Sequence, residues 1–251
     1  MSGGENTLIS HLEALRSALL RIVAAVAILY LPCYWASPYL VEWLTRWCFS
    51  SGHELYYFTP MEAFWVQLKL ALVVSLILSY PWNALQLWKF VLPALYPKER
   101  RTIGSWILLS SFLFLCGGVF CIGCILPLLM EFSASFATSS LRPMIGLAGF
   151  VDMAGWLTLG FSLMFQTPIV VYAAVRAGLV SAAALAKKRP FVVVGILILS
   201  ALLTPPDVMS QLLLAGPTWL LFETGLLFAR RAEKRRAAAE ADTAPENGGT
   251  E

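Results

Sequence analysis

Apolar residues gather in long stretches along this chain, and short polar segments separate them. The stretches run over about 19–34, 62–92, 103–130, 152–177, 191–203 and 212–228. They lack the strict alternation of apolar and polar positions that membrane barrel strands show, so they predict helices. A helix of about 20 apolar residues crosses a bilayer. The pattern therefore predicts an all-α integral membrane protein with six transmembrane helices, of which the last two are short.

The two ends of the chain differ from this apolar middle. Residues 1–18 are predicted to form a short amphipathic helix, because their leucines share one face. Residues 19–229 form the predicted six-helix membrane domain. The tail, 230–251, is basic at first and then rich in Ala, Glu and Gly, which predicts disorder after about Arg236.

Two longer polar segments interrupt the membrane domain and are predicted to be loops. The first covers 36–58, and its aromatic content is typical of a cap at the membrane interface. The second covers 133–150.

Composition and charge agree with this class and add an orientation. The chain has 251 residues, of which 59% are hydrophobic and 13% charged, and its mean hydropathy is +0.73. A soluble domain of this length would need far more polar surface. With the N-terminus inside, every Lys and Arg except Arg46, Lys69 and Arg142 lies at the cytoplasmic side. Because cytoplasmic loops are enriched in Lys and Arg, both termini are predicted to be cytoplasmic.

The five cysteines predict close helix packing and not a disulfide framework. Ser110, Gly117, Cys121 and Cys124 follow one another at spacings of 7, 4 and 3, which makes a stripe of small residues. A redox or metal role for the last two is the alternative, but no histidine lies near them. The sequence predicts no cofactor and no metal site.

A sparse set of polar residues lies at membrane depth, where polar residues are functional candidates. They are Glu62, Lys69, Gln166, Asp207, Gln211 and Glu223. The alternative is that they only join helices by hydrogen bonds, and both hypotheses stay open for Glu62 and Lys69. Glu223 favours function, because an unpaired acid in a short helix is hard to explain as structure. The motifs of common hydrolases, metalloenzymes and nucleotide-binding enzymes are absent, so the chain is not predicted to be an enzyme.

An acid also lies in the segment between the second and third apolar stretches. Glu99 follows Pro93 and Pro97, which stop the preceding helix and stiffen the loop. The distribution of Lys and Arg places this loop at the cytoplasmic side. A carboxylate held rigidly between two spans predicts a docking point for a cationic partner.

Several motifs follow one another in a fixed order from residue 11 to about residue 228. They are His11-Leu-Glu-Ala-Leu-Arg16, Pro60-x-Glu-x-Phe64, Gln86-x-Trp-x-Phe-x-x-Pro-Ala-Leu-Tyr-x-x-Glu-Arg-Arg101, Phe165-Gln-Thr-Pro168, Lys188-Arg-Pro190, Leu203-Thr-Pro-Pro-Asp-x-x-Ser-Gln211 and Phe222-Glu223. In this series the chain resembles the TatC family, the receptor subunits of the twin-arginine protein translocase. The family's six helices, with both ends in the cytoplasm, agree with the orientation reached from charge.

The resemblance implies a signal-peptide receptor in the bacterial inner membrane. Such a protein binds signal peptides that carry two consecutive arginines, and helps to export folded proteins with the proton gradient. Its partners are the single-span subunits TatA and TatB, further copies of itself and membrane lipids, and it has no nucleic-acid partner. The implied signal-peptide contacts are Glu13, Arg16, Phe90, Lys98, Glu99 and Arg100. A carboxylate suits this ligand, because a guanidinium group donates two parallel hydrogen bonds to it.

Two positions depart from the family's pattern. Ala14 stands where the family usually has a second acid, and Glu13 lies one residue earlier, about 100° around the helix. Glu13 can therefore replace that acid only if the helix rotates or the peptide shifts. Gln166 stands where the family often has Glu, which favours the binding of a polar partner group over proton transfer.

Two further hypotheses concern the C-terminal half. The stretches 191–203 and 212–228 would span only about 20 and 26 Å as helices, at about 1.5 Å per residue. The hydrocarbon core is about 30 Å thick, so they would thin the bilayer locally unless neighbouring helices cover them. The rival function is a secondary transporter of a small solute or ion, which would use Gln166, Asp207 and Glu223.

Overall fold

The computed structural model describes residues 3–49, 55–95, 103–136, 144–203 and 208–242, with the backbone alone at 3–11, 90–95, 103 and 236–242. Its helices are α1 (Gly3–Cys48), α2 (Glu62–Leu95), α3 (Ile103–Phe120), the π-helical turn η2 (Cys121–Ile125), α4 (Leu126–Ser135), α5 (Leu147–Met164), α6 (Thr167–Arg176), α7 (Ala182–Lys187), α8 (Arg189–Leu203) and α9 (Val208–Asp242). Two short strands, β1 (Leu55–Tyr56) and β2 (Ile145–Gly146), pair in parallel.

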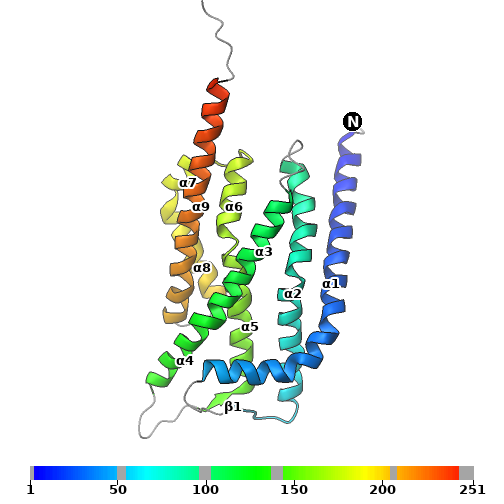
Figure 1. Cartoon of the computed structure of the whole chain (residues 1–251), viewed down its shortest axis with the longest axis vertical. Helices are drawn as coiled ribbons and strands as arrows, with labels where there is room; N and C mark the ends of the chain where they lie inside the picture. The colour runs from blue at the N-terminus through cyan, green and yellow to red at the C-terminus, as the bar shows by residue number, and fades with distance from the viewer. Residues whose placement is uncertain (1–2, 50–54, 96–102, 137–143, 204–207, 243–251) are drawn as a thin grey trace, which may run out of the picture.

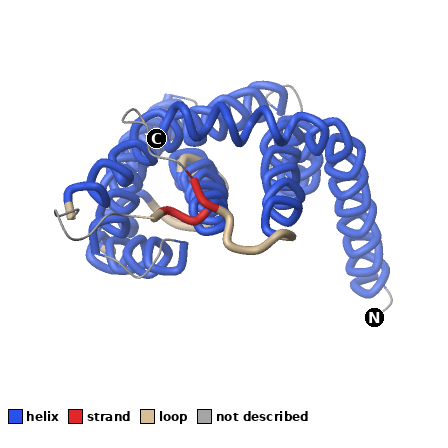
Figure 2. Tube along the Cα trace, turned by 90° about the horizontal axis from the view of Figure 1, so that it is seen from below, coloured by secondary structure: helices blue, strands red, loops and turns tan. Residues whose placement is uncertain are grey.

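The long helices stand side by side in one bundle (Figure 1). We call the end where α1 begins the N-terminal end, and the end that holds β1 and β2 the strand end. Viewed from the strand end, the strand pair lies across the bundle with helices around it (Figure 2).

The all-α membrane fold is confirmed. Five helical segments of the described chain are long and apolar enough to cross a membrane, and α8 is a shorter apolar helix. Two of the five are compound, because α3 continues through η2 into α4, and α5 is followed at once by α6. Since α1 begins and α9 ends at the N-terminal end, the first and last described helices agree with six passes (Figure 1).

Helix α1 is longer than predicted and includes a segment that was predicted to be a loop. It has no break after the amphipathic residues, and its last part turns to run across the strand end (Figure 1). Pro32 and Pro38 lie inside it. A proline within a helix removes a backbone donor and crowds the preceding turn, so it bends the helix. The prediction of a loop over 36–58 is therefore wrong for 36–48. We call residues 38–48 the crossing segment.

The third span contains a widened turn that no periodicity in the sequence reveals. In η2 the N–H of Leu126 donates to the carbonyl of Cys121, five residues earlier. The next residue, Pro127, has no N–H to donate. The carbonyl of Ile122 is thus left without a donor from its own helix, and the indole Nε1 of Trp47 donates to it over 3.0 Å. This bond attaches the crossing segment to the third span.

The fourth span is broken in its middle. Helix α5 ends at Met164 and α6 begins at Thr167, with Pro168 in the first turn of α6. Proline suits the first turn of a helix and cannot continue the hydrogen bonding of a preceding one, so the break follows from the sequence. The span also begins at Leu147, and the predicted loop over 133–150 is wrong at both of its ends.

The C-terminal helices differ from each other in length. Helix α8 is short, as predicted, whereas α9 continues past the predicted end at Phe228 as far as Asp242. The added residues are mostly Ala, Arg, Glu and Lys, which have high helix propensity. Disorder was predicted after about Arg236, and this is wrong up to Asp242.

The predicted stripe of small residues packs against α5 over most of its length. Ser110, Gly117 and Cys121 are buried. A Cβ on Gly117 would lie 2.7 Å from the carbonyl oxygen of Phe161, so the two helices touch through their backbones. Cys124 is exposed, because it lies inside η2, where the widened turn shifts the helical register.

Helices α6 and α9 also approach closely through a glycine. A Cβ on Gly225 would lie 2.7 Å from the Cα of Pro168 and 3.0 Å from its carbonyl oxygen. Backbone atoms cannot move aside as the end of a side chain can. The close packing of α6 against α9 therefore requires glycine at position 225.

We expect Gly225→Ala to lower the free energy of unfolding by on the order of 1–3 kcal/mol, the usual cost of overpacking. Gly216→Ala on the same helix is the matched control, because nothing lies within 4 Å of a Cβ there. Thermal unfolding of the purified protein in detergent measures both variants. Equal melting temperatures for the two would contradict the close contact.

Candidate functional site

The structure describes only part of the predicted signal-peptide contact region. Four predicted site residues lie outside the described residues: Lys98, Glu99, Arg100 and Asp207. Phe90 is described only by its backbone, near the end of α2. The side chains of Glu13 and Arg16 are exposed on α1.

Glu13 lies at the same end of the bundle as the end of α2. Helices α1 and α2 run in opposite directions, and Nη1 of Arg21 lies 3.5 Å from Oε1 of Gln86. Glu13 precedes Arg21 by eight residues, or about 12 Å of helix. An equal distance beyond Gln86 reaches about residue 94 of α2. The exposed carboxylate of Glu13 is therefore level with the last turn before the segment that contains Glu99.

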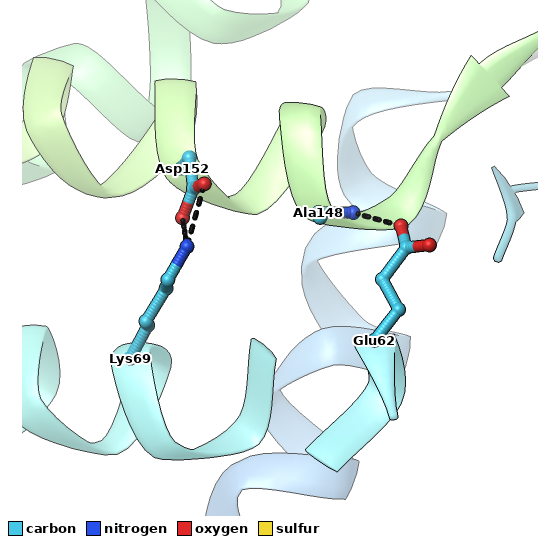
Figure 3. A network of polar contacts seen from close by, with 4 residues as sticks. All are labelled: Glu62, Lys69, Ala148 and Asp152. Atoms are coloured by element: carbon cyan, nitrogen blue, oxygen red, sulfur yellow. Dashed lines mark hydrogen bonds and ion pairs between the residues drawn. The ribbon is translucent and has the colours of Figure 1, made fainter. Parts of the chain in front are cut away.

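Glu62 ties the start of α2 to the start of α5 at the strand end (Figure 3). Its Oε2 accepts hydrogen bonds from the backbone N–H groups of Phe58 and Thr59, at 2.8 and 3.4 Å. Its Oε1 accepts from the N–H of Ala148, in the first turn of α5, at 2.9 Å. The first N–H groups of a helix have no partner within it. One carboxylate thus caps α5 and orders the chain before α2, which explains why α5 begins earlier than predicted.

Lys69 joins the same two helices further along the bundle. Its Nζ lies 2.8 Å from both carboxylate oxygens of Asp152, and both side chains are partly exposed, at 51% and 40% (Figure 3). Asp152 is not among the site residues predicted from the sequence. A signal was present, because an acid in one apolar stretch needs a partner at membrane depth and Lys69 in another stretch could provide it. The contacts of Glu62 and Lys69 agree with the hypothesis that these residues join helices.

Gln166 lies at the break between α5 and α6 and binds α3 with both ends of its amide. Its Oε1 accepts from the hydroxyl of Ser110 at 2.8 Å, and its Nε2 donates to the Ser110 carbonyl at 3.0 Å. The same hydroxyl lies 3.0 Å from that of Tyr80 on α2. A neutral amide can satisfy both bonds without the cost of burying a charge. Gln166 therefore binds a group of its own chain, and a role toward a partner stays a prediction.

Two polar contacts join α8 to α9. Nη2 of Arg189 lies 2.7 Å from Oε2 of Glu223, and Nε2 of Gln211 donates to the carbonyl of Leu197 at 3.0 Å. Glu223 was expected to be unpaired, and this is wrong. Arg189 opens α8 from the charged segment that precedes it, and its long side chain reaches the acid from there.

These contacts give the membrane-level polar residues a common structural effect. Each described member of the set bonds to a backbone or side-chain group of another helix or of a helix start. Within the ranges that the structure covers, no group of three or more His, Cys, Asp and Glu residues could hold a metal ion. The described polar groups can therefore hold helices in register.

The Lys69–Asp152 pair can be tested by a double-mutant cycle. Lys69→Met and Asp152→Leu should each lower the melting temperature in lipid nanodiscs, because each leaves one charge without its partner. The double variant should lose less than the two single losses added together, with a coupling of about 0.5–3 kcal/mol. Strictly additive losses would show that the pair contributes nothing to stability.

Comparison with known proteins places the chain in a family. The family model described as "Sec-independent protein translocase protein (TatC)" matches residues 10–217. The Sec-independent protein translocase protein TatC of Azotobacter chroococcum is 34% identical over 238 residues, which cover 94% of this chain and 93% of the relative. The protein of the same description from Escherichia coli K12 is 36% identical over 226 residues, 89% and 88% of the two chains.

A solved structure shows the same fold. A crystal structure of the twin arginine translocase receptor TatC superposes with a TM-score of 0.81 at 29% sequence identity. The match covers 89% of this chain and 99% of that receptor. From its sequence and its fold together, this chain belongs to the TatC family of Sec-independent protein translocase proteins.

Proposed function

We propose that this chain is a receptor for twin-arginine signal peptides in a bacterial inner membrane. It works at the core of a translocase that exports folded proteins with the energy of the proton gradient. The observation that carries this proposal is the likeness to the twin arginine translocase receptor, which extends over 99% of that chain.

The proposal makes the N-terminal end of the bundle cytoplasmic. Basic residues at helix ends gather there, as the positive-inside rule requires. Helices α6 and α7 end there and α8 begins there (Figure 1), which places Arg176, Lys187, Lys188 and Arg189 at this end. The strand end, with the crossing segment, then lies at the outer face of the membrane.

The arginine pair of the signal peptide docks at this cytoplasmic end. Glu99 provides the main carboxylate, and its guanidinium ligand is held by two parallel hydrogen bonds. Glu13 lies level with the end of α2 and can meet the second arginine, at a different angle from an acid at position 14. Arg16, Phe90, Lys98 and Arg100 complete the proposed contact region. An exposed ion pair gains only about 0–1 kcal/mol, so the specificity comes from the geometry of the fork and not from charge alone.

The single-span subunits TatA and TatB are the proposed partners, together with further copies of this chain. We place a partner contact at Gln211, in the first turn of α9, and at Asp207, which precedes that helix in the sequence and lies outside the described residues. The shortness of α8 supports local thinning of the bilayer beside it. The contacts of Gln166 and of one carboxylate oxygen of Glu223 within this chain favour the receptor proposal over the transporter hypothesis.

Glu99→Ala should weaken binding of an Arg-Arg signal peptide about fivefold, the loss expected for a contact of about 1 kcal/mol, the upper end for an exposed ion pair. Binding of a matched Lys-Lys peptide should weaken less, because an ammonium group cannot form the fork. Photo-crosslinking of both peptides to the protein in membrane vesicles measures the two losses. Equal losses would contradict recognition by the guanidinium fork.

Ala14→Glu should preserve or strengthen binding of the same Arg-Arg peptide, because it adds an acid at the position that relatives use. Glu13→Ala in the Ala14→Glu background is the control, and we expect it to leave binding unchanged if the new acid takes over. The same crosslinking assay reads both. A clear loss of binding in Ala14→Glu would show that this chain docks the peptide with a different geometry.

A further inference from the structure

Six exposed side chains form a row along α1, and they change from aliphatic to aromatic along the helix. The members of the row are Ile28, Leu31, Trp35, Tyr39, Trp43 and Trp47, at spacings of three or four residues. Their exposed fractions lie between 52% and 80%. The first two are aliphatic and belong to the spanning part of the helix. The last four, which we call the aromatic stripe, lead onto the crossing segment.

The crossing segment has two opposite sides of different chemistry. Leu44 and Cys48 are buried in the main core of the bundle. At about 100° per residue, Glu42 and Arg46 lie nearly opposite them. These two form an exposed ion pair, with 2.5 Å between the guanidinium Nη2 and the carboxylate Oε1. One side of the segment therefore faces protein, and the other suits water.

Trp43 and Trp47, the last two members of the aromatic stripe, lie between these two sides. The rings of Trp43 and Trp47 are stacked, with centroids 6.2 Å apart and planes 13° from parallel. The bond from Trp47 to the Ile122 carbonyl holds this end of the stripe against the third span. The crossing segment thus has protein on one side, charged side chains on the opposite side and amphipathic rings between them. This arrangement is the one expected of a helix at the membrane–water interface. Trp and Tyr prefer that depth, because their rings are apolar and their N–H or O–H groups are not.

We propose that the aromatic stripe lies at the boundary between lipid headgroups and acyl chains, and that lipid covers it. The stripe is continuous with the apolar surface of the α1 span, which faces away from the protein and is long and apolar enough to face lipid. The most apolar window of the spanning part of α1 is 0% buried within the protein, and the stripe extends that surface without a gap. The aliphatic part of the row ends at Leu31 and the aromatic part begins at Trp35, on either side of Pro32, one of the two prolines inside the helix. The stripe thereby fixes the depth at which α1 turns along the membrane.

Depth-dependent fluorescence quenching tests this placement. The protein is reconstituted in phosphatidylcholine vesicles that carry a nitroxide at the headgroup or at the end of the acyl chain, and iodide is the aqueous quencher. Subtracting the emission of Trp35→Phe/Trp43→Phe from that of the wild type isolates these two indoles. We expect the headgroup nitroxide to quench this difference about twofold more than the deep nitroxide, as an interfacial position requires. Iodide should have little effect.

Trp106→Phe is the control, because Trp106 is buried and its difference spectrum should respond to none of the quenchers. The phenylalanine substitutions keep an aromatic ring, and unchanged melting temperatures verify the fold. Strong quenching of the stripe by iodide would place it in water. Stronger quenching by the deep nitroxide would place it in the hydrocarbon core. Protection from all three quenchers would show that a second copy or another protein covers it. Each of these three results overturns the proposal.

Discussion

Backbone groups inside a bilayer have no water to bond, so each must find a partner within the protein. Each proline inside a span of this chain removes one backbone donor, so the carbonyl that it would have served needs another partner. Pro127 removes the donor that the Ile122 carbonyl needs, and the indole of Trp47 replaces it from another helix. Pro168 ends the ladder of α5, and Gln166, at the same break, binds α3 instead. The irregular points of the spans are thus the points where the bundle is joined laterally.

The polar side chains at membrane depth also join the helices laterally. Glu62 caps α5, Lys69 pairs with Asp152, and Arg189 pairs with Glu223. Each contact joins elements that the apolar core alone would leave free to slide. In our proposal, ligand recognition therefore takes place at the N-terminal end, while the membrane-level polar groups keep the scaffold in register.

Much of this architecture could be predicted, because apolar length alone decides which segments can cross a bilayer. The pairing of helices could not. Lys69 and Asp152 are each visible in the sequence, but only the packing of α2 against α5 shows that they meet. Residues 36–58 were predicted to be a loop, whereas α1 continues through them as far as Cys48 and buries Leu44 and Cys48. That choice depends on tertiary packing, which overrides local propensity. The segment around Glu99, the main predicted contact, lies outside the described residues.

The strand end also has a consequence for the order of assembly. Trp47 bonds to a carbonyl 75 residues later in the chain, Lys69 to an acid 83 residues later, and Glu62 to an amide 86 residues later. Contacts between distant residues can form only after the intervening chain has been made and inserted. The crossing segment thus gains its attachment when the third span arrives, and the starts of α2 and α5 lock together only with the fourth. The strand end is therefore completed only after the helices that its contacts join are in place.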